Sequence, residues 1–376
     1  MEIIVDASAM KAAVKKLSLT AYKKATLPMC RNIHMEAKKS ALILAVTDAN
    51  LVRYLCLRAE VQEEGCCAVD CDKLGKILAS AKKPVVTISA DDDNVKVESG
   101  IKITLPAEKW EDMETIRPVN DKKETAHVAF KDGMLQSAIS QVEWSLPRKD
   151  AHKPNMECVA IDLRGENPVA VCTDARTMAW KEMEGAEIVL PGADTGIVPE
   201  KLPMIPGYAL DAIKSMTGSI TLTVFGDILI LKTGAEDYIR TKLTPGNFPD
   251  YWRVIPQDPK YKLSLEENLR KGLKDYQKLL KSMEAKDEKV YLTFSDESTK
   301  FSYHAEGVHV EDEVPLQAEF SGIYEGFEVL LDLGLLMPLL NAHKEMPVCG
   351  VNDAENPIRF DYPDGYSALL MPCRTK

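Results

Sequence analysis

Hydrophobic residues along this chain recur at two spacings, one typical of amphipathic helices and one of half-buried strands. Between positions 8 and 19, Met10, Val14 and Leu17 fall on one face of a helix, while Lys11 and Lys15 fall on another. Short apolar or alternating runs bounded by turn residues indicate strands. The N-terminal third is therefore predicted to hold helices at 8–19 and 72–81 and strands at 3–5, 33–36, 41–46, 51–59, 85–89, 95–98 and 101–105.

The same order of helices and strands returns twice. The second third is predicted to hold helices at 131–145 and 199–216, strands reaching position 180, and strands at 128–130, 220–225, 228–233 and 238–243. The last third is predicted to hold helices at 265–283 and 331–343, with strands at 290–295, 299–306, 317–324, 358–362 and 366–372. This pattern predicts an α+β fold of three similar domains, each with two helices and antiparallel sheets: 1–124, 125–253 and 254–376.

A local repeat supports this division. The apolar run at 169–172 ends in Thr173-Asp174-Ala175, and the run at 42–46 ends in Thr47-Asp48-Ala49. An asparagine, Asn32 or Asn155, opens the preceding strand, 15 or 18 residues before the threonine. A strand that ends in an aspartate-containing turn is common, so this match counts only alongside the repeated order of elements.

Composition places the chain among soluble globular proteins. Of its 376 residues, 45% are hydrophobic and 28% are charged, which is enough apolar material for several cores. No apolar run approaches the roughly 18 residues that span a bilayer, and the first residues lack the regions of a signal peptide. We therefore expect a cytoplasmic protein without a membrane partner.

Cysteine and aspartate clusters do not indicate a metal site. The nine cysteines are scattered, which is typical of reduced thiols packed as small hydrophobes. The one cluster, Cys66, Cys67 and Cys71, lacks a fourth ligand at zinc-site spacing. The acidic run at 91–94 separates two predicted strands and is interpreted as a solvated hairpin turn. No metal and no cofactor are predicted.

The net charge of −11 argues against nucleic acid as a partner, but the charges are unevenly distributed. Segment 8–24 holds five lysines and no acid, and segment 72–83 holds four lysines against one aspartate. Segment 84–115 holds eight carboxylates against three lysines, and segment 305–328 holds seven carboxylates without lysine or arginine. Lysines on one helix usually only solvate it. Their recurrence on a second helix predicts a basic, helix-lined surface and acidic strands elsewhere.

An enzyme is the main rival class for a chain of this size. The sequence has no phosphate-binding G-x-x-x-x-G-K-[ST], no zinc-binding H-E-x-x-H and no G-x-S-x-G nucleophile motif. Asp174 and Arg176 could form a catalytic pair, but an aspartate in a turn usually hydrogen-bonds its own backbone. The sequence therefore predicts a non-catalytic protein.

Motifs spread over the whole chain resemble the bacterial DNA polymerase III beta subunit, or sliding clamp, family. Thr26-Leu27-Pro28 with Arg31-Asn32-Ile33 is similar to a first-domain motif of that family, and TDARTMA at 173–179 is similar to its TDGHRLA. The most specific match is GNFPDYWRVIP at 246–256, which resembles G-x-FPDYxRVxP between the family's second and third domains. LLMPCR at 369–374 resembles the family's terminal VMPMR.

The resemblance implies a ring-shaped, head-to-tail homodimer, with helices lining a central hole and sheets outside. It also implies sequence-independent binding of double-stranded DNA, loading by a clamp loader, and tethering of the replicative DNA polymerase and other proteins with clamp-binding peptides. The charge pattern fits such a ring, because basic helices facing inward meet phosphates. The positions implied to face DNA are Lys11, Lys15, Lys23, Lys24, Lys73, Lys76, Arg148, Lys149, His152 and Lys153.

The resemblance further implies an apolar groove between the second and third domains that accepts short peptides rich in Gln, Leu and Phe. The matching positions are Pro154, Thr173, Ala175, Arg176, Thr177, Met178, Pro249, Arg253, Val254, Leu369, Leu370, Met371, Pro372, Cys373 and Arg374. Ala175, Arg176 and Thr177 replace the family's Gly, His and Arg, so we expect an altered peptide preference. The alternative function is a clamp-fold scaffold that does not encircle DNA.

Overall fold

The computed structural model describes residues 1–21, 25–112, 124–147, 154–190, 201–234, 237–285, 288–294, 298–305, 308–315 and 327–374. The chain forms two compact units. The first combines Met1–Ser137 with Gly185–Pro245, and the second combines Ala138–Glu184 with Gly246–Lys376. Each unit takes in parts of two predicted domains, and the three-domain division stays a prediction. None of the helices in the described ranges is long and apolar enough to cross a membrane.

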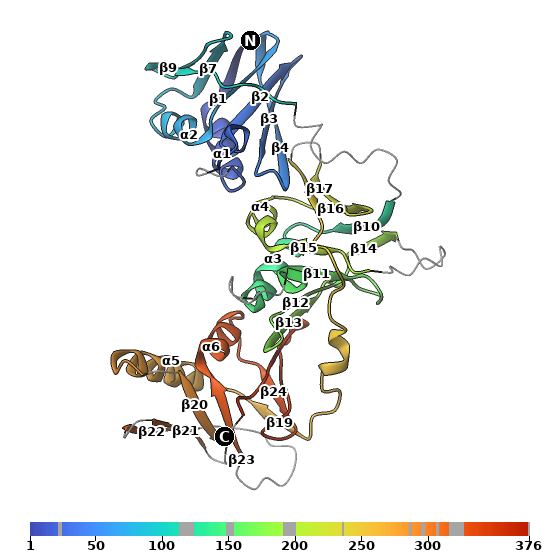
Figure 1. The fold of residues 1–376 in the computed structure, drawn as a ribbon, viewed down its shortest axis with the longest axis vertical. Coiled ribbons are helices and arrows are strands. Elements are labelled where there is room, and N and C mark those ends of the chain that lie inside the picture. The colour runs from blue at the N-terminus through green and yellow to red at the C-terminus, as the bar shows by residue number, and fades with distance from the viewer. Residues whose placement is uncertain are drawn as a thin grey trace. The chain divides into compact units, whose positions relative to one another are not determined.

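The first unit contains two antiparallel sheets and a pair of packed helices (Figure 1). Helix α1 (Ala7–Leu17) packs against α2 (Cys71–Ala79) and contacts strands of both sheets. The strand orders are β5-β1-β7-β8-β9 and β14-β10-β16-β17-β18-β4-β3-β2-β6. The strands are β1 (Glu2–Asp6), β2 (Asn32–Lys38), β3 (Ala41–Thr47), β4 (Leu51–Arg58), β5 (Glu60–Glu63), β6 (Gly65–Asp70), β7 (Val85–Ala90), β8 (Asn94–Glu98), β9 (Lys102–Pro106), β10 (Glu124–Phe130), β14 (Glu187–Leu190), β16 (Ile220–Phe225), β17 (Ile228–Thr233) and β18 (Asp237–Lys242).

The second unit repeats this arrangement, with α5 (Glu267–Ser282) packed against α6 (Leu333–Asn341). One sheet has the order β22-β21-β20-β23, and in the other β11-β12-β13-β26-β25-β24-β19 are neighbours. The strands are β11 (Cys158–Asp162), β12 (Val169–Thr173), β13 (Thr177–Glu182), β19 (Tyr261–Ser264), β20 (Lys289–Phe294), β21 (Ser298–Ala305), β22 (Val308–Pro315), β23 (Phe327–Asp332), β24 (Val348–Val351), β25 (Ile358–Asp361) and β26 (Tyr366–Leu370).

Three of the helices begin in the same way, on an aspartate that ends a strand. Asp6 accepts a hydrogen bond from the backbone N–H of Ala9, and Asp70 and Asp332 cap α2 and α6 likewise. Such caps satisfy backbone donors that the first helical turn leaves without partners. The buried face of α1 includes Met10 as predicted and belongs to the core cluster of the first unit. The strand-to-helix order is therefore encoded locally at these three positions.

One strand pairing recurs in both units. In the first unit β4, which follows the Thr47-Asp48-Ala49 turn, pairs antiparallel with β18. In the second unit β13, which follows the Thr173-Asp174-Ala175 turn, pairs antiparallel with β26. Each pairing joins two of the predicted domains into one sheet, which explains why the compact units cut across the predicted boundaries.

The two turns are also alike in atomic detail. Thr47 donates a hydrogen bond to the Leu51 carbonyl at 2.8 Å, as Thr173 does to the Thr177 carbonyl at 2.6 Å. The alanines that follow have positive φ angles, 75° for Ala49 and 71° for Ala175. The local repeat seen in the sequence is therefore confirmed as a repeated structure.

The α+β class and most of the predicted elements are confirmed, with shifted ends. One prediction is wrong: in place of a helix over 199–216, the described residues form strand β15 (Met204–Pro206) and a short helix α4 (Leu210–Lys214). Proline explains the error, since Pro206 would interrupt the interior of such a helix.

Several strands were not predicted, among them β5, β6, β14, β19 and β24. Most of them are short, so alternation over a few residues gave no signal. The strand predicted at 317–324 lies outside the described residues. Segment 305–328, predicted as acidic strand and loop, contains β22 in its described part.

Candidate functional site

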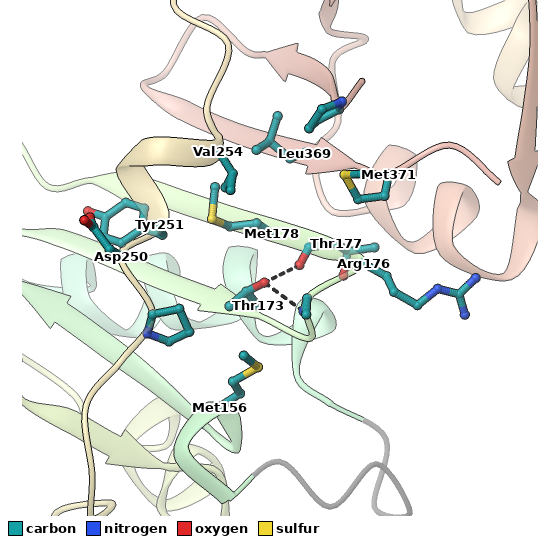
Figure 2. A pocket seen from close by; sticks show the side chains of 13 residues that line it. Met156, Thr173, Arg176, Thr177, Met178, Asp250, Tyr251, Val254, Leu369 and Met371 are labelled. Carbon is teal, nitrogen blue, oxygen red and sulfur yellow. Dashed lines mark hydrogen bonds between the residues drawn. The ribbon is translucent and has the colours of Figure 1, made fainter. Parts of the chain in front are cut away.

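A cavity of about 190 Å³ opens on the second unit, and Figure 2 shows its lining. Met178 lies in the middle of this view, with Val254 and Leu369 near its side chain, while Arg176 extends away from the pocket. Most of the lining residues come from the end of β12 and the turn after it, from β13, from the end of β26, and from the segment between β18 and β19, while two others precede β11 and β25. They are Met156, Thr173, Ala175, Arg176, Thr177, Met178, Pro249, Asp250, Tyr251, Val254, Pro357, Leu369 and Met371.

The turn between β12 and β13 forms one wall. The carboxylate of Asp174 accepts hydrogen bonds from the backbone N–H groups of Arg176 (2.8 Å) and Thr177 (2.6 Å), and Thr173 accepts one from Ala175 (3.1 Å). Asp174 thus bonds its own turn, as predicted. Because the turn satisfies its own backbone and hydroxyl groups, this wall presents mainly apolar surface to the cavity.

The opposite wall is a four-residue 3₁₀ helix, η7 (Tyr251–Val254). Tyr251 is buried, whereas Val254 is 53% exposed and available to a ligand. The floor follows from strand pairing, because Met178 on β13 stands directly opposite Leu369 on β26. Strand pairing and the linker thus bring together segments that are far apart in the sequence.

Charges stand at the rim of the cavity. Arg176 lies 3.3 Å from Asp332, and Asp250 lies 2.7 Å from Arg253. All four side chains are partly or largely exposed, so these pairs contribute little to stability. They leave a site with an apolar floor and polar margins, which suits a short peptide more than a small charged metabolite.

Nine of the predicted groove positions line the cavity: Thr173, Ala175, Arg176, Thr177, Met178, Pro249, Val254, Leu369 and Met371. Six others are not part of the lining: Pro154, Arg253, Leu370, Pro372, Cys373 and Arg374. Leu370 is fully buried, because neighbouring residues of a strand point to opposite faces of the sheet. Arg253 instead forms the rim pair with Asp250.

Sequence reasoning missed four lining residues: Met156, Asp250, Tyr251 and Pro357. Asp250 and Tyr251 lie inside the FPDY motif, so a signal for them was present. Met156 and Pro357 precede buried strands, and nothing in their local sequence marks a site.

Four of the predicted DNA-facing lysines lie on the helices of the first unit and are exposed. Lys11 and Lys15 lie on α1, and Lys73 and Lys76 lie on α2, where Lys76 also pairs with Asp72 at 2.7 Å. The other predicted DNA-facing positions lie outside the described residues: Lys23, Lys24, Arg148, Lys149, His152 and Lys153.

Helix α5 carries a second basic face that sequence reasoning missed. Its exposed lysines are Lys271, Lys274, Lys278 and Lys281. Lys278 pairs with Asp275 on the same helix at 2.8 Å. The signal was available in the sequence, since these lysines recur at helical spacing opposite a leucine face.

Cysteines and acidic residues do not assemble a metal site in the described part of the chain, where no cluster of three or more His, Cys, Asp or Glu side chains is found. All nine cysteines are free of disulfides. Burial raises the pKa of the Cys67 thiol to about 12.

Solved structures with the same fold are bacterial beta clamps. The Helicobacter pylori beta clamp bound to a DNA ligase peptide matches over 100% of both chains with a TM-score of 0.83 and 18% identity. The beta subunit from DNA polymerase of Streptococcus pyogenes matches over 100% of both chains with a TM-score of 0.84 and 15% identity. The two units therefore have the fold of the bacterial DNA clamps.

Sequence comparison points the same way. The beta sliding clamp of Helicobacter pylori is 20% identical over 384 residues, 99% of each chain, and that of Vibrio cholerae is 24% identical over 266 residues, 68% of each. No protein-family model matches the chain. The chain is a divergent relative of the bacterial beta sliding clamps.

Proposed function

We propose that this protein is a sliding clamp that encircles duplex DNA and tethers the replicative polymerase and other replication or repair proteins. It acts in the cytoplasm as a non-catalytic processivity factor. The observation that carries the proposal is the apolar cavity on the second unit, assembled from the three segments that match the family's motifs.

The cavity is the proposed docking site for partner peptides. Its methionines, Met156, Met178 and Met371, supply an adaptable apolar surface. The exposed charged groups at the rim, Arg176, Asp250 and Arg253, supply polar partners that orient a bound chain. The Helicobacter pylori beta clamp, which has the same fold, is bound to a DNA ligase peptide in its solved structure. Because Ala175, Arg176 and Thr177 differ from the family's Gly, His and Arg, we expect this chain to prefer different peptide sequences.

The basic helices are the proposed contacts with DNA. Lysines on α1, α2 and α5 attract phosphates without reading sequence, and such contacts permit sliding. The clamp loader and the topology of the ring then account for retention, so individual contacts need only be weak.

Ring closure is proposed between copies of this chain. Among the described strands, β9 and β22 are edge strands of their sheets. Edge strands expose backbone donors and acceptors, and pairing β9 of one copy with β22 of another satisfies them in a head-to-tail dimer. Light scattering should give about twice the chain mass of 41.7 kDa. A stable monomer at micromolar concentration would count against ring closure.

Retention on DNA tests the function itself. The loaded protein should stay on circular DNA and leave the same DNA after linearisation. Glutamate in place of Lys11, Lys15, Lys73 and Lys76 should reduce loading while leaving the dimer intact, because exposed helix residues contribute little to folding. Glutamate at Lys109, which is exposed and lies outside the helices, is the control for charge reversal at the surface. Equal loading of the parent and the fourfold variant refutes the DNA-facing assignment, and equal retention on linear and circular DNA favours the scaffold alternative.

A further inference from the structure

Behind the linker wall of the cavity lies a carboxylate with five hydrogen-bond donors. Asp162, at the end of β11, is 3% exposed. It accepts bonds from the backbone N–H, Nε and Nη2 of Arg164 at 3.0, 2.9 and 2.7 Å. It also accepts bonds from the Tyr251 hydroxyl at 2.9 Å and from the Trp252 indole N–H at 3.3 Å. We call these four residues the Asp162 hub.

Two of the donors in this hub belong to the wall of the cavity. Tyr251 and Trp252 are consecutive residues of η7, and their rings stack with centroids 5.0 Å apart and planes at 30°. Phe248 packs edge-on against Tyr251 at 6.2 Å. The ring of Tyr251 lines the cavity while its hydroxyl reaches Asp162. The hub thus connects β11 to the surface that a peptide would touch.

This wall has little other support. A 3₁₀ helix of four residues is too short to be stable by itself, and η7 has no side-chain cap. Of its residues only Tyr251 is buried. Backbone anchors flank it on either side, from Asn155 to the Asn247 carbonyl at 3.2 Å and from Arg359 to the Pro256 carbonyl at 3.2 Å. Between these anchors, the side chains of Tyr251 and Trp252 both donate hydrogen bonds to Asp162.

The charges of the hub favour this geometry. Burial alone would raise the pKa of Asp162, but the hydrogen bonds from Arg164 and Tyr251 hold it below its usual value. Burial and the nearby Asp162 charge raise the pKa of Tyr251, so its hydroxyl remains a donor. An ionised acceptor with a protonated donor gives a strong bond of fixed direction.

We propose that Asp162 and Arg164 are positioning residues that hold the η7 wall at the distance a peptide requires, a role that rests on the proposed function of the groove. They do not line the cavity themselves. They act through Tyr251 and Trp252, whose hydrogen bonds to Asp162 link η7 to β11, so the position of β11 sets the width of the groove.

The first test is peptide affinity, measured by fluorescence anisotropy with a peptide from the polymerase of the same organism. Tyr251→Phe keeps the ring in the groove and removes only the hydroxyl, and Asp162→Asn weakens the acceptor for all five donors. Each should weaken binding by roughly three- to tenfold, which is less than the full contribution of a charge-assisted hydrogen bond, because the lost bond positions the wall and does not itself contact the peptide. The control is Asp364→Asn, which alters a more exposed carboxylate that Lys181 contacts in the turn before β26, outside the cavity lining. It should bind like the parent.

The second test reports on the hub without a peptide. Labelling with 5-fluorotryptophan gives one fluorine resonance for each of the four tryptophans, and Trp252→Phe identifies the signal of Trp252. Asp162→Asn and Tyr251→Phe should shift that signal and leave the other three in place, which also shows that the variants remain folded.

The outcomes separate the two proposals. If the parent binds the peptide and both hub variants bind equally well, the positioning role is overturned while the groove stands. If the Trp252 signal is unchanged in Asp162→Asn, the hub does not hold the wall and the role is again overturned. If the parent does not bind, the groove itself is refuted, and the positioning role that rests on it is refuted too.

Discussion

A buried ion pair joins β4 to β18, and removing one partner should destabilise the first unit strongly. Arg53 and Asp237 have side chains that are 0% and 5% exposed. Their two contacts are parallel, from Nε to Oδ1 at 3.0 Å and from Nη2 to Oδ2 at 2.6 Å. Arg53 also donates to the hydroxyl of Ser215 at 2.6 Å. Arg53→Met keeps most of the volume and removes the charge, so Asp237 is left buried without its partner.

The magnitude follows from desolvation. Breaking a buried pair by removing one partner costs about 3–5 kcal/mol, because the remaining charge stays away from water. Replacing both partners with apolar residues of similar size removes this penalty and is often neutral or stabilising. We therefore expect Arg53→Met to lower the free energy of unfolding by about 3–5 kcal/mol, and Arg53→Met with Asp237→Leu to recover most of that loss.

Urea-induced unfolding measures the free energies, and hydrogen exchange of the β4 and β18 amides locates the effect. In Arg53→Met these amides should exchange faster than those of β25 and β26 in the second unit. A loss below about 1 kcal/mol in Arg53→Met would mean that the pair is worth no more than an exposed one, which contradicts the burial described above. A double variant as unstable as the single one would assign the cost to packing instead of charge.

Three further outcomes are expected. Met178→Asp places a charge on the apolar floor of the cavity and should weaken peptide binding at least about tenfold, with the dimer retained. An aspartate at Val189, which is 50% exposed on β14, should leave peptide binding unchanged. Equal binding by both variants would show that the peptide binds elsewhere. Ala175→Val should unfold at a lower temperature than Ala175→Gly in a thermal melt. The reason is the positive φ of 71°, which costs a branched residue about 1–2 kcal/mol more than glycine. The opposite order of melting temperatures would refute backbone strain in this turn. Burial would raise the pKa of Asp364, but hydrogen bonds, first of all the one from Lys181, hold this pKa at about 2. The stabilisation that the ionised carboxylate gives is therefore present above the unfolded pKa of about 3.9 and is lost as the pH falls toward 2. Over this range the free energy of unfolding of the parent should fall more steeply than that of Asp364→Asn, and parallel curves would contradict this expectation.

Local features of the fold were readable from the sequence because their causes are local. Helical spacing of Met10, Val14 and Leu17 predicted α1, and alternation predicted most of the longer strands. The repeated threonine–aspartate–alanine turns were recognisable because their hydrogen bonds join residues two to four positions apart. The helix predicted at 199–216 failed where the sequence itself carried the contrary signal in its prolines.

Part of the candidate site was also readable, but only through resemblance to a family. The motifs at 173–179, 246–256 and 369–374 supplied nine of the lining positions. They could not separate Leu369, which faces the cavity, from Leu370, which is buried on the other face of β26. The side a residue faces depends on the register between β13 and β26, which no single strand encodes.

Tertiary structure alone decided which distant segments meet. Met178 and Leu369 stand opposite each other although 191 positions separate them, because antiparallel pairing of β13 with β26 is a property of the assembled sheet. The same holds for Asp162, an ordinary strand-end aspartate in the sequence, which becomes the support of a cavity wall once Tyr251 and Trp252 reach it across 89 and 90 positions. Sequence patterns report local preferences, whereas burial of a charge and convergence of its donors exist only after the chain has folded.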